Sequence, residues 1–515
     1  MALPADTDGY RLAAVAIALG LYAAALGWLS MGTGVLPASD REQYELIAFN
    51  LARHGEFHVS RTLAADLADG PLQPYSRRSP GYPLYLAAVF ASSAEFRALN
   101  QTCISDPACE AADPLRNRVR GLTVALIGAT VALAFVTTLA LAGNWTVSIA
   151  TGLLCLLLVP TMTSDIPNVL AGFWLLLHAS LAALNWRTPR AALGVPSGLA
   201  LGALMLTKEV FQYWLVGFAF LLAAAAWLDA GRRRALVAAC LAPVLAAAAL
   251  TLPWMIRNAM VVGHFGISGR DGENVAIRAE YGRMNWAEVR GGFAYYLPDF
   301  ALVAGARDVA MRWLEPENFG YTRFDRENPE GFYRRAKDDT GETAARASLI
   351  DPGWRDSQVA TDAALRRASA ELMRADWRKH VALTLVFLER AALSIGGNCK
   401  NAATAAAERA GPAMRMPVRA TCALGTVSTP LFLPLACVLL LLAWRRRTYA
   451  LLLLVSPVAY GFGIHAAATH FIPRYARPLL PLLVVVAAVA AHESWRCIVE
   501  RRRREPSPRP AAQPG

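Results

Sequence analysis

The chain has 515 residues, 55% of them hydrophobic, and a formal net charge of +12 at pH 7. Its mean hydropathy of +0.33 excludes an ordinary soluble protein of this length. The arginines stand in clusters directly beside apolar runs, which is the pattern of membrane topology, so we expect no nucleic-acid partner.

Long apolar runs dominate the chain, and about ten of them have the roughly 17–25 residues that a helix needs to cross a bilayer. In chain order, these predicted spans are 11–31, 118–141, 146–164, 167–185, 192–207, 211–228, 235–256, 427–444, 448–468 and 477–495. Arginine clusters flank four of the spans, at 187–190, 232–234, 445–447 and 501–504. Counting alternately through ten spans puts every cluster in the cytoplasm, which predicts an all-α polytopic membrane protein with large outer loops at 32–117 and 257–426.

The first outer loop begins with an acidic residue at the end of a membrane span. Asp40 is followed by Tyr44, Ile47 and Leu51, whose three- and four-residue spacing predicts an amphipathic helix on the membrane surface. Further along, Arg77 and Arg78 lead into a Pro-Gly-Tyr-Pro sequence at 80–83, where the prolines favour the start of a second helix.

The cysteines and histidines of the outer loops are candidates for disulfides and for metal binding. Two pairs lie in predicted outer loops, Cys103 with Cys109 and Cys399 with Cys422, and each pair suits a disulfide on the oxidising side of the membrane. The histidines in the same regions are too scattered for a metal triad, which favours packing roles for His264, His465 and His470.

The longest polar region, 257–380, is too long for a plain loop, so we predict a cap folded on the membrane face, with a helix near 357–377. The glycine cluster at 266–272 follows a membrane span and lacks the lysine of a phosphate-binding loop, which argues against nucleotide binding. The apolar stretch 380–396 contains Glu389-Arg390 and is interpreted as an interfacial helix, because a crossing there would invert the helices that follow.

Charged residues at membrane depth are costly and are therefore candidates for function. Asp40 follows the first span, Asp165 the third and Lys208 the fifth, and Arg474 precedes the last span, all on the predicted outer side. Fixed cations there would stabilise a phosphate leaving group, and a carboxylate would accept a proton from an incoming hydroxyl.

Each of these residues also has a purely structural interpretation. Asp40 could be a solvated helix end and Asp165 a helix cap. Lys208 could pair with Glu209, and Arg474 could anchor its helix at the interface.

The acid at a helix end, followed by an arginine pair and Pro-Gly-Tyr-Pro, resembles the first loop of the GT-C superfamily of membrane glycosyltransferases. The stretches 253–265 and 474–481 resemble segments of a bacterial subgroup related to protein O-mannosyltransferases and the lipid A aminoarabinose transferase. The resemblance implies a GT-C bundle in a bacterial inner membrane, with its active site on the periplasmic side, Asp40 as the base and Asp165 in the same site. Arg41 stands where many members have a second acid, which leaves a divalent cation, Mg²⁺ or Mn²⁺, open.

We therefore expect a glycosyltransferase that moves a sugar, with inversion, from an undecaprenyl- or decaprenyl-type phosphate donor to an outer lipid, glycan or protein acceptor. The expected parts are a transmembrane module at 1–256, a cap with the interfacial helix at 257–426, membrane helices at 427–500 and a disordered tail at 501–515. The expected catalytic carboxylates are Asp40 and Asp165, and the expected ligands of the donor phosphate are Arg78, Lys208 and Arg474. Additional candidate site residues are Arg77, Glu42, Tyr44, Tyr82, Arg257 and Tyr475.

Three alternatives stay open. One is an enzyme like an O-antigen ligase or polymerase, which uses a diphosphate-linked donor. Another is a secondary transporter, although no inverted repeat is visible in the sequence. The third is a catalytically inactive scaffold.

Overall fold

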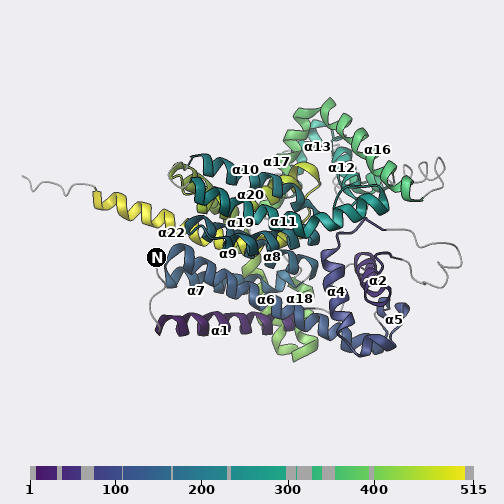
Figure 1. Ribbon diagram of the computed structural model, residues 1–515, viewed down its shortest axis with the longest axis horizontal. Helices are drawn as coiled ribbons and strands as arrows, with labels where there is room; N and C mark the ends of the chain where they lie inside the picture. The colour runs from purple at the N-terminus through teal and green to yellow at the C-terminus, as the bar shows by residue number, and fades with distance from the viewer. Residues whose placement is uncertain are drawn as a thin grey trace, which may run out of the picture.

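The computed structural model describes residues 7–31, 38–59, 75–106, 108–163, 166–228, 233–296, 309, 328–338, 354–393 and 399–504, and the regular structure in these ranges is helical (Figure 1). Among them, nine helices are long and apolar enough to cross a membrane. They correspond to α1 (Thr7–Ser30), α6 (Asp113–Ala142), α7 (Trp145–Met162), α8 (Ile166–Arg187), α10 (Gln212–Leu228), α11 (Arg233–Val262), α19 (Arg415–Arg445), α20 (Tyr449–Ala468) and α22 (Leu480–Arg504). The prediction of an all-α polytopic membrane protein is confirmed.

The fifth predicted span differs from the other nine in length. Residues 192–207 fall in α9 (Ala191–Thr207), a helix of 17 residues. At 1.5 Å per residue it extends about 25 Å, less than a bilayer core of about 30 Å. It packs on α8 and α11 and ends at the pocket described below.

Small residues set the closest helix contacts in the bundle. At the crossing of α1 and α6, a Cβ atom on Gly128 would lie 2.5 Å from the carbonyl oxygen of Gly20, so only glycine permits this approach of the two backbones. Longer apolar side chains fill the centre of the bundle, where α22 packs on α6, α7, α8 and α19.

Shorter helices lie at one end of the bundle, which we call the loop end (Figure 1). The first outer loop supplies α2 (Ala38–His54), α4 (Gly81–Ala91) and α5 (Gln101–Ser105). The cap region supplies α12 (Asp271–Tyr281), α13 (Trp286–Tyr295), α16 (Trp354–Ala375), α17 (Trp377–Leu393) and α18 (Cys399–Ala410), and α21 (Pro473–Ala476) precedes α22. The predicted interfacial stretch corresponds to α17, which is not among the membrane-length helices of the described chain.

Both predicted disulfides are confirmed. Cys103 is bonded to Cys109, with Cα atoms 5.2 Å apart, within the first outer loop. Cys399 is bonded to Cys422, with Cα atoms 5.5 Å apart, and this bond joins α18 to α19.

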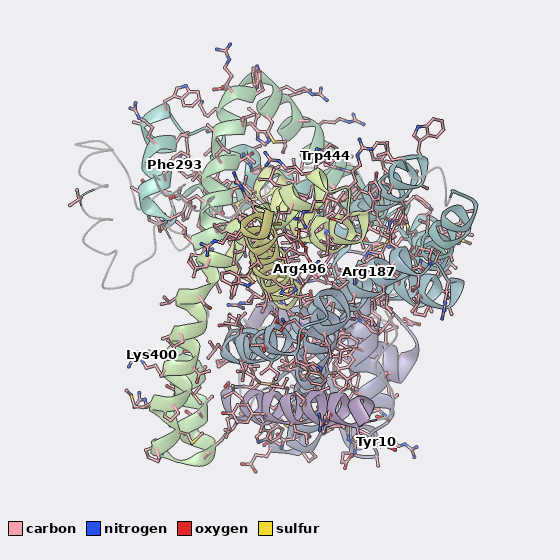
Figure 2. The ribbon with its side chains drawn as sticks, turned by 90° about the vertical axis from the view of Figure 1, so that its left-hand side faces the viewer. Tyr10, Arg187, Phe293, Lys400, Trp444 and Arg496 are labelled. Atoms are coloured by element: carbon pink, nitrogen blue, oxygen red, sulfur yellow. A yellow bond between two sulfur atoms is a disulfide. The ribbon has the colours of Figure 1, made fainter. Side chains whose placement is uncertain are left out.

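The opposite end of the bundle, which we call the arginine end, contains the far ends of the same helices. Figure 2 is seen from this side, and Arg187 and Arg496 are labelled in it. One prediction here was wrong: residues 501–504 continue α22 as helix instead of beginning a disordered tail. Arginine is a good helix former, and positive charge is favourable at a helix C-terminus. The rest of the predicted tail lies outside the described residues.

Candidate functional site

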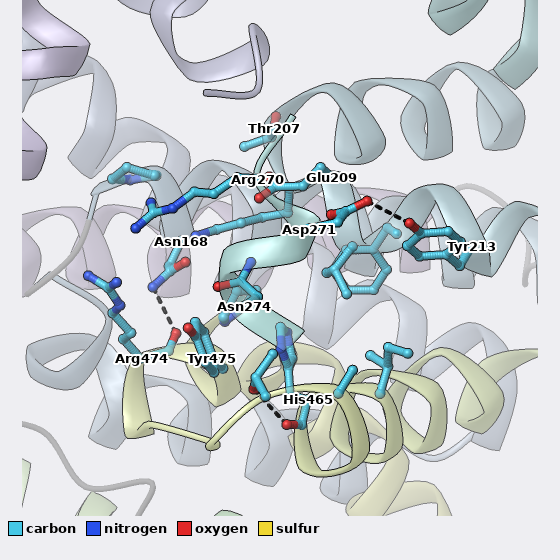
Figure 3. A pocket seen from close by; sticks show the side chains of 18 of the residues that line it. Asn168, Thr207, Glu209, Tyr213, Arg270, Asp271, Asn274, His465, Arg474 and Tyr475 are labelled. Carbon is cyan, nitrogen blue, oxygen red and sulfur yellow. Dashed lines mark hydrogen bonds between the residues drawn. The ribbon is translucent and has the colours of Figure 1, made fainter. Parts of the chain in front are cut away.

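A pocket of about 380 Å³ opens at the loop end, where the first outer loop, α8, the junction of α9 with α10, α12, α20 and α21 meet (Figure 3). Four cationic residues line it, from four separate segments: Arg78, Lys208, Arg270 and Arg474. Two acids, Glu209 and Asp271, and three tyrosines, Tyr44, Tyr213 and Tyr475, share the same lining.

The first outer loop contributes Tyr44 and Arg78. Arg78 Nε donates a hydrogen bond of 2.8 Å to Gln43 Oε1, and its guanidinium carbon lies 5.1 Å from the centre of the Tyr44 ring. Tyr44 in turn packs edge-on against Tyr82, which is 2% exposed, with ring centres 5.1 Å apart. Tyr82 therefore supports this wall from behind.

Gly81 explains how the first outer loop reaches the membrane helices. A Cβ atom at this position would lie 2.7 Å from the backbone nitrogen of Thr207, the last residue of α9. The start of α4 can rest on the end of α9 only with glycine there. Beside this contact, the Ser79 hydroxyl donates a hydrogen bond to Glu209, so Arg78 and Lys208 line one pocket.

Arg270 is held in place by a buried carboxylate. Its Nε donates a hydrogen bond of 2.8 Å to Oε2 of Glu273, which is 4% exposed. Arg77 reaches the same oxygen at 3.0 Å, and Lys337 pairs with the other oxygen. Arg77 thus binds Glu273, whereas its neighbour Arg78 lines the pocket.

Asp271 begins α12 and lies in the pocket wall. The Tyr213 hydroxyl donates a hydrogen bond of 2.7 Å to its Oδ2. Burial raises the pKa of Asp271, the hydrogen bond from Tyr213 lowers this pKa, and the charge of Glu209 raises it again. The next residue, Gly272, donates its backbone N–H to Asp362 Oδ1 at 2.6 Å, which fixes α12 to α16.

The C-terminal side of the pocket is formed by α20 and α21. The backbone carbonyl of Arg474 accepts a hydrogen bond of 2.9 Å from Asn168 Nδ2, which ties α21 to α8. The Tyr475 ring stacks on His465 with ring centres 4.4 Å apart. In the part of the chain that the structure describes, no group of three His, Cys, Asp or Glu side chains could hold a metal ion.

The structure brings five of the predicted site residues together in the pocket: Tyr44, Arg78, Lys208, Arg474 and Tyr475. Arg257 lies elsewhere, with its guanidinium carbon 5.0 Å from the Trp254 ring and Nη1 bonded to the backbone carbonyl of Tyr75.

The predicted acids are only partly described. Asp165 lies outside the described residues, and so do the side chains of Asp40 and Glu42, although both belong to α2. Residues four apart lie on one face of a helix, so the register of α2 puts position 40 on the face that carries Tyr44.

Sequence reasoning missed Arg270, Asp271, Tyr213 and Asn168 as pocket residues. Arg270 and Asp271 belong to the glycine cluster at 266–272, whose sequence argues against nucleotide binding and gives no other motif. The available signal was their position, a few residues after a membrane span on the predicted outer side.

No protein-family model, curated protein or solved structure matches this chain. The function must therefore be argued from the pocket itself.

Proposed function

We propose that the protein is a membrane glycosyltransferase of the GT-C type, which transfers a sugar from a polyprenyl-phosphate donor to an acceptor outside the cytoplasm. The observation that carries the proposal is the convergence of Arg78, Lys208, Arg270 and Arg474 on one pocket at the end of the bundle. Cations supplied by four separate segments suit an anionic group held at the level of the lipid headgroups, as the phosphate of a lipid-linked sugar is.

The position of the pocket along the helices supports an active site on the side of the membrane that faces away from the cytoplasm. The pocket lies at the start of α8 and at the ends of α9 and α20. Arg187 is the last residue of α8, and residues 445–447 lie just before the start of α20, so these arginines lie at the opposite ends of α8 and α20. Arginine-rich connections are retained in the cytoplasm. The pocket would then face outward, and its apolar lining residues, among them Val275 and Ile464, would meet the lipid tail.

The reaction requires two events. The bond between the anomeric carbon and the phosphate oxygen breaks, and the bonding electrons leave with the phosphate, whose added charge the four cations stabilise. An acceptor hydroxyl forms the new bond from the opposite face and gives its proton to a carboxylate. We assign this base to Asp40, one helical turn before Tyr44 in α2, and Asp165 remains the second proposed acid.

The direct test compares wild-type protein in lipid with Asp40→Asn, using a panel of polyprenyl-phosphate sugars and membrane-extract acceptors. We expect one donor to be consumed, and its turnover to fall about 10²–10⁴-fold in the variant, because general-base catalysis is lost. Mass spectrometry follows donor and product. Glu110→Gln, an exposed acid of the same loop, is the control and should match wild type. Consumption of no donor, or equal activity of Asp40→Asn, would contradict the proposal.

The proposed orientation has its own test in two single-cysteine chains. The chain that retains only Cys103, in the first outer loop, should react with a membrane-impermeant maleimide in spheroplasts, whose inner membrane is intact. The chain that retains only Cys497, near the C-terminal end of α22, should react only after the cells are permeabilised. The reverse pattern would put the pocket in the cytoplasm.

A further inference from the structure

The pocket is polarised. Figure 3 shows Arg474 and Asn168 on one side of it and Asp271 and Tyr213 on the other, with Glu209 beside Asp271. We call Glu209, Asp271 and Tyr213 the acidic end of the pocket. Two carboxylates repel a phosphate, so this end does not suit the anionic part of a donor.

The acidic end is a built arrangement. Tyr213 fixes one oxygen of Asp271 at 2.7 Å, and Ser79 bonds to one oxygen of Glu209. Asp271 also sits at the start of α12, which the hydrogen bond from Gly272 to Asp362 holds against α16. Both carboxylates are therefore oriented by elements from distant parts of the chain.

Each carboxylate keeps a second oxygen for a ligand. Within the described residues, Asp271 Oδ1 and Glu209 Oε1 have no hydrogen-bond partner. A carboxylate oxygen accepts hydrogen bonds from hydroxyl groups, so both oxygens suit a ligand that donates. A sugar has several neighbouring hydroxyl groups, and each of them can donate a hydrogen bond to an oxygen of this kind.

We infer that Glu209, Asp271 and Tyr213 bind the hydroxyl groups of the donor sugar, while its phosphate binds to the cations of the same pocket, with Arg474 on the side opposite Asp271. The inference rests on the proposed function and adds the residues that distinguish one sugar from another. A pocket of about 380 Å³ falls within the range of about 300–1,000 Å³ found for small-molecule sites. A pocket of this volume has room for one sugar phosphate.

The test measures binding of two kinds of lipid to the full chain in nanodiscs. The first is undecaprenyl phosphate, and the second is a panel of undecaprenyl-phosphate-linked neutral hexoses and pentoses. We expect at least one glycosylated lipid to bind more tightly than the bare lipid. Asp271→Asn and Glu209→Gln should each weaken that binding about 10-fold and leave the affinity for undecaprenyl phosphate within about twofold.

Two further variants make the pattern specific. Arg474→Gln should weaken the binding of both lipids, because it acts on the phosphate. Asp376→Asn, at a half-exposed acid directly after the end of α16, should change neither affinity. The thermal unfolding midpoint of each variant shows whether it is folded.

The outcomes separate the two proposals. If undecaprenyl phosphate binds in an Arg474-dependent manner but no sugar tightens it, or if Asp271→Asn weakens both lipids equally, the inference about the acidic end is overturned and the phosphate site stands. If undecaprenyl phosphate does not bind at all, the proposed function itself fails.

Discussion

The arginines at the two ends of the bundle are held in different ways. At the arginine end, exposed Arg187 donates hydrogen bonds of 3.0 Å to the last carbonyls of α6, and exposed Arg446 lies 3.6 Å from Glu493. At the loop end, Arg78, Arg270 and Arg474 are half-buried in the lining of one pocket.

The difference separates two uses of positive charge. Arginines that satisfy helix-end carbonyls and surface acids stabilise the bundle and set its topology. Arginines held from the side by Glu273, Gln43 or a tyrosine ring keep a fixed direction toward a cavity, which is the arrangement an anion site requires. A count of charges along the sequence does not distinguish them.

The largest expected effect tests this distinction on two arginines. Arg474→Gln should lower glycosyl transfer about 10²–10³-fold, because a donor to the leaving phosphate is lost. Arg446→Gln removes an exposed ion pair and should stay within about twofold of wild type. Initial rates with the donor that the wild-type protein consumes in the panel described above measure both. Equal losses in the two variants would show that the ends do not differ as we describe.

A smaller effect is expected where the loop end is assembled. Gly81→Ala adds a Cβ atom 2.7 Å from the backbone of α9, so α4 must shift and Arg78 must move with it. We expect a loss of about 1–3 kcal/mol of stability, which is typical of overpacking, together with reduced transfer. Gly121→Ala, in α6, meets nothing within 4 Å and is the control. The idea fails if the thermal unfolding midpoints of the two variants agree.

Much of this architecture could be predicted because its signals are local. The lengths of the apolar runs predict the membrane helices. Successive helices joined by short connections run in opposite directions, which puts the helix ends beside Lys208 and Arg474 on the same side of the membrane. The different roles of Arg77 and Arg78 could not be predicted from the sequence. Arg77 binds Glu273, which is 196 positions away along the chain, whereas Arg78 lines the pocket.

The acidic end could not be predicted for a different reason. Asp271 reaches the pocket because α12 is fixed to α16 by the hydrogen bond from Gly272 to Asp362, two residues 90 positions apart. Nothing in the local sequence of either segment specifies this partner. Convergence of this kind is a property of the tertiary structure.

The smallest expected effect is a pH dependence that distinguishes acids at the two ends. Glu389, in α17, has its pKa raised by burial from 4.5 to about 7, so the folded state prefers its neutral form. Between these values the folded protein binds a proton that the unfolded chain has lost, and stability falls as pH rises from 4.5 to 7. Because the side chain is partly exposed, we expect this term to be about 1 kcal/mol.

Glu389→Gln should remove that part of the pH dependence, with the unfolding midpoint rising relative to wild type at pH 7 and converging with it near pH 4.5. Glu493, at the arginine end, pairs with Arg446 and Arg496, so Glu493→Gln loses favourable ion pairs instead and should not stabilise the protein at pH 7. Unfolding midpoints measured from pH 4.5 to 7.5 compare the two variants. If the two variants show the same shift of the unfolding midpoint at every pH, burial does not disfavour the charge of Glu389. The difference between the two ends would then be limited to their arginines.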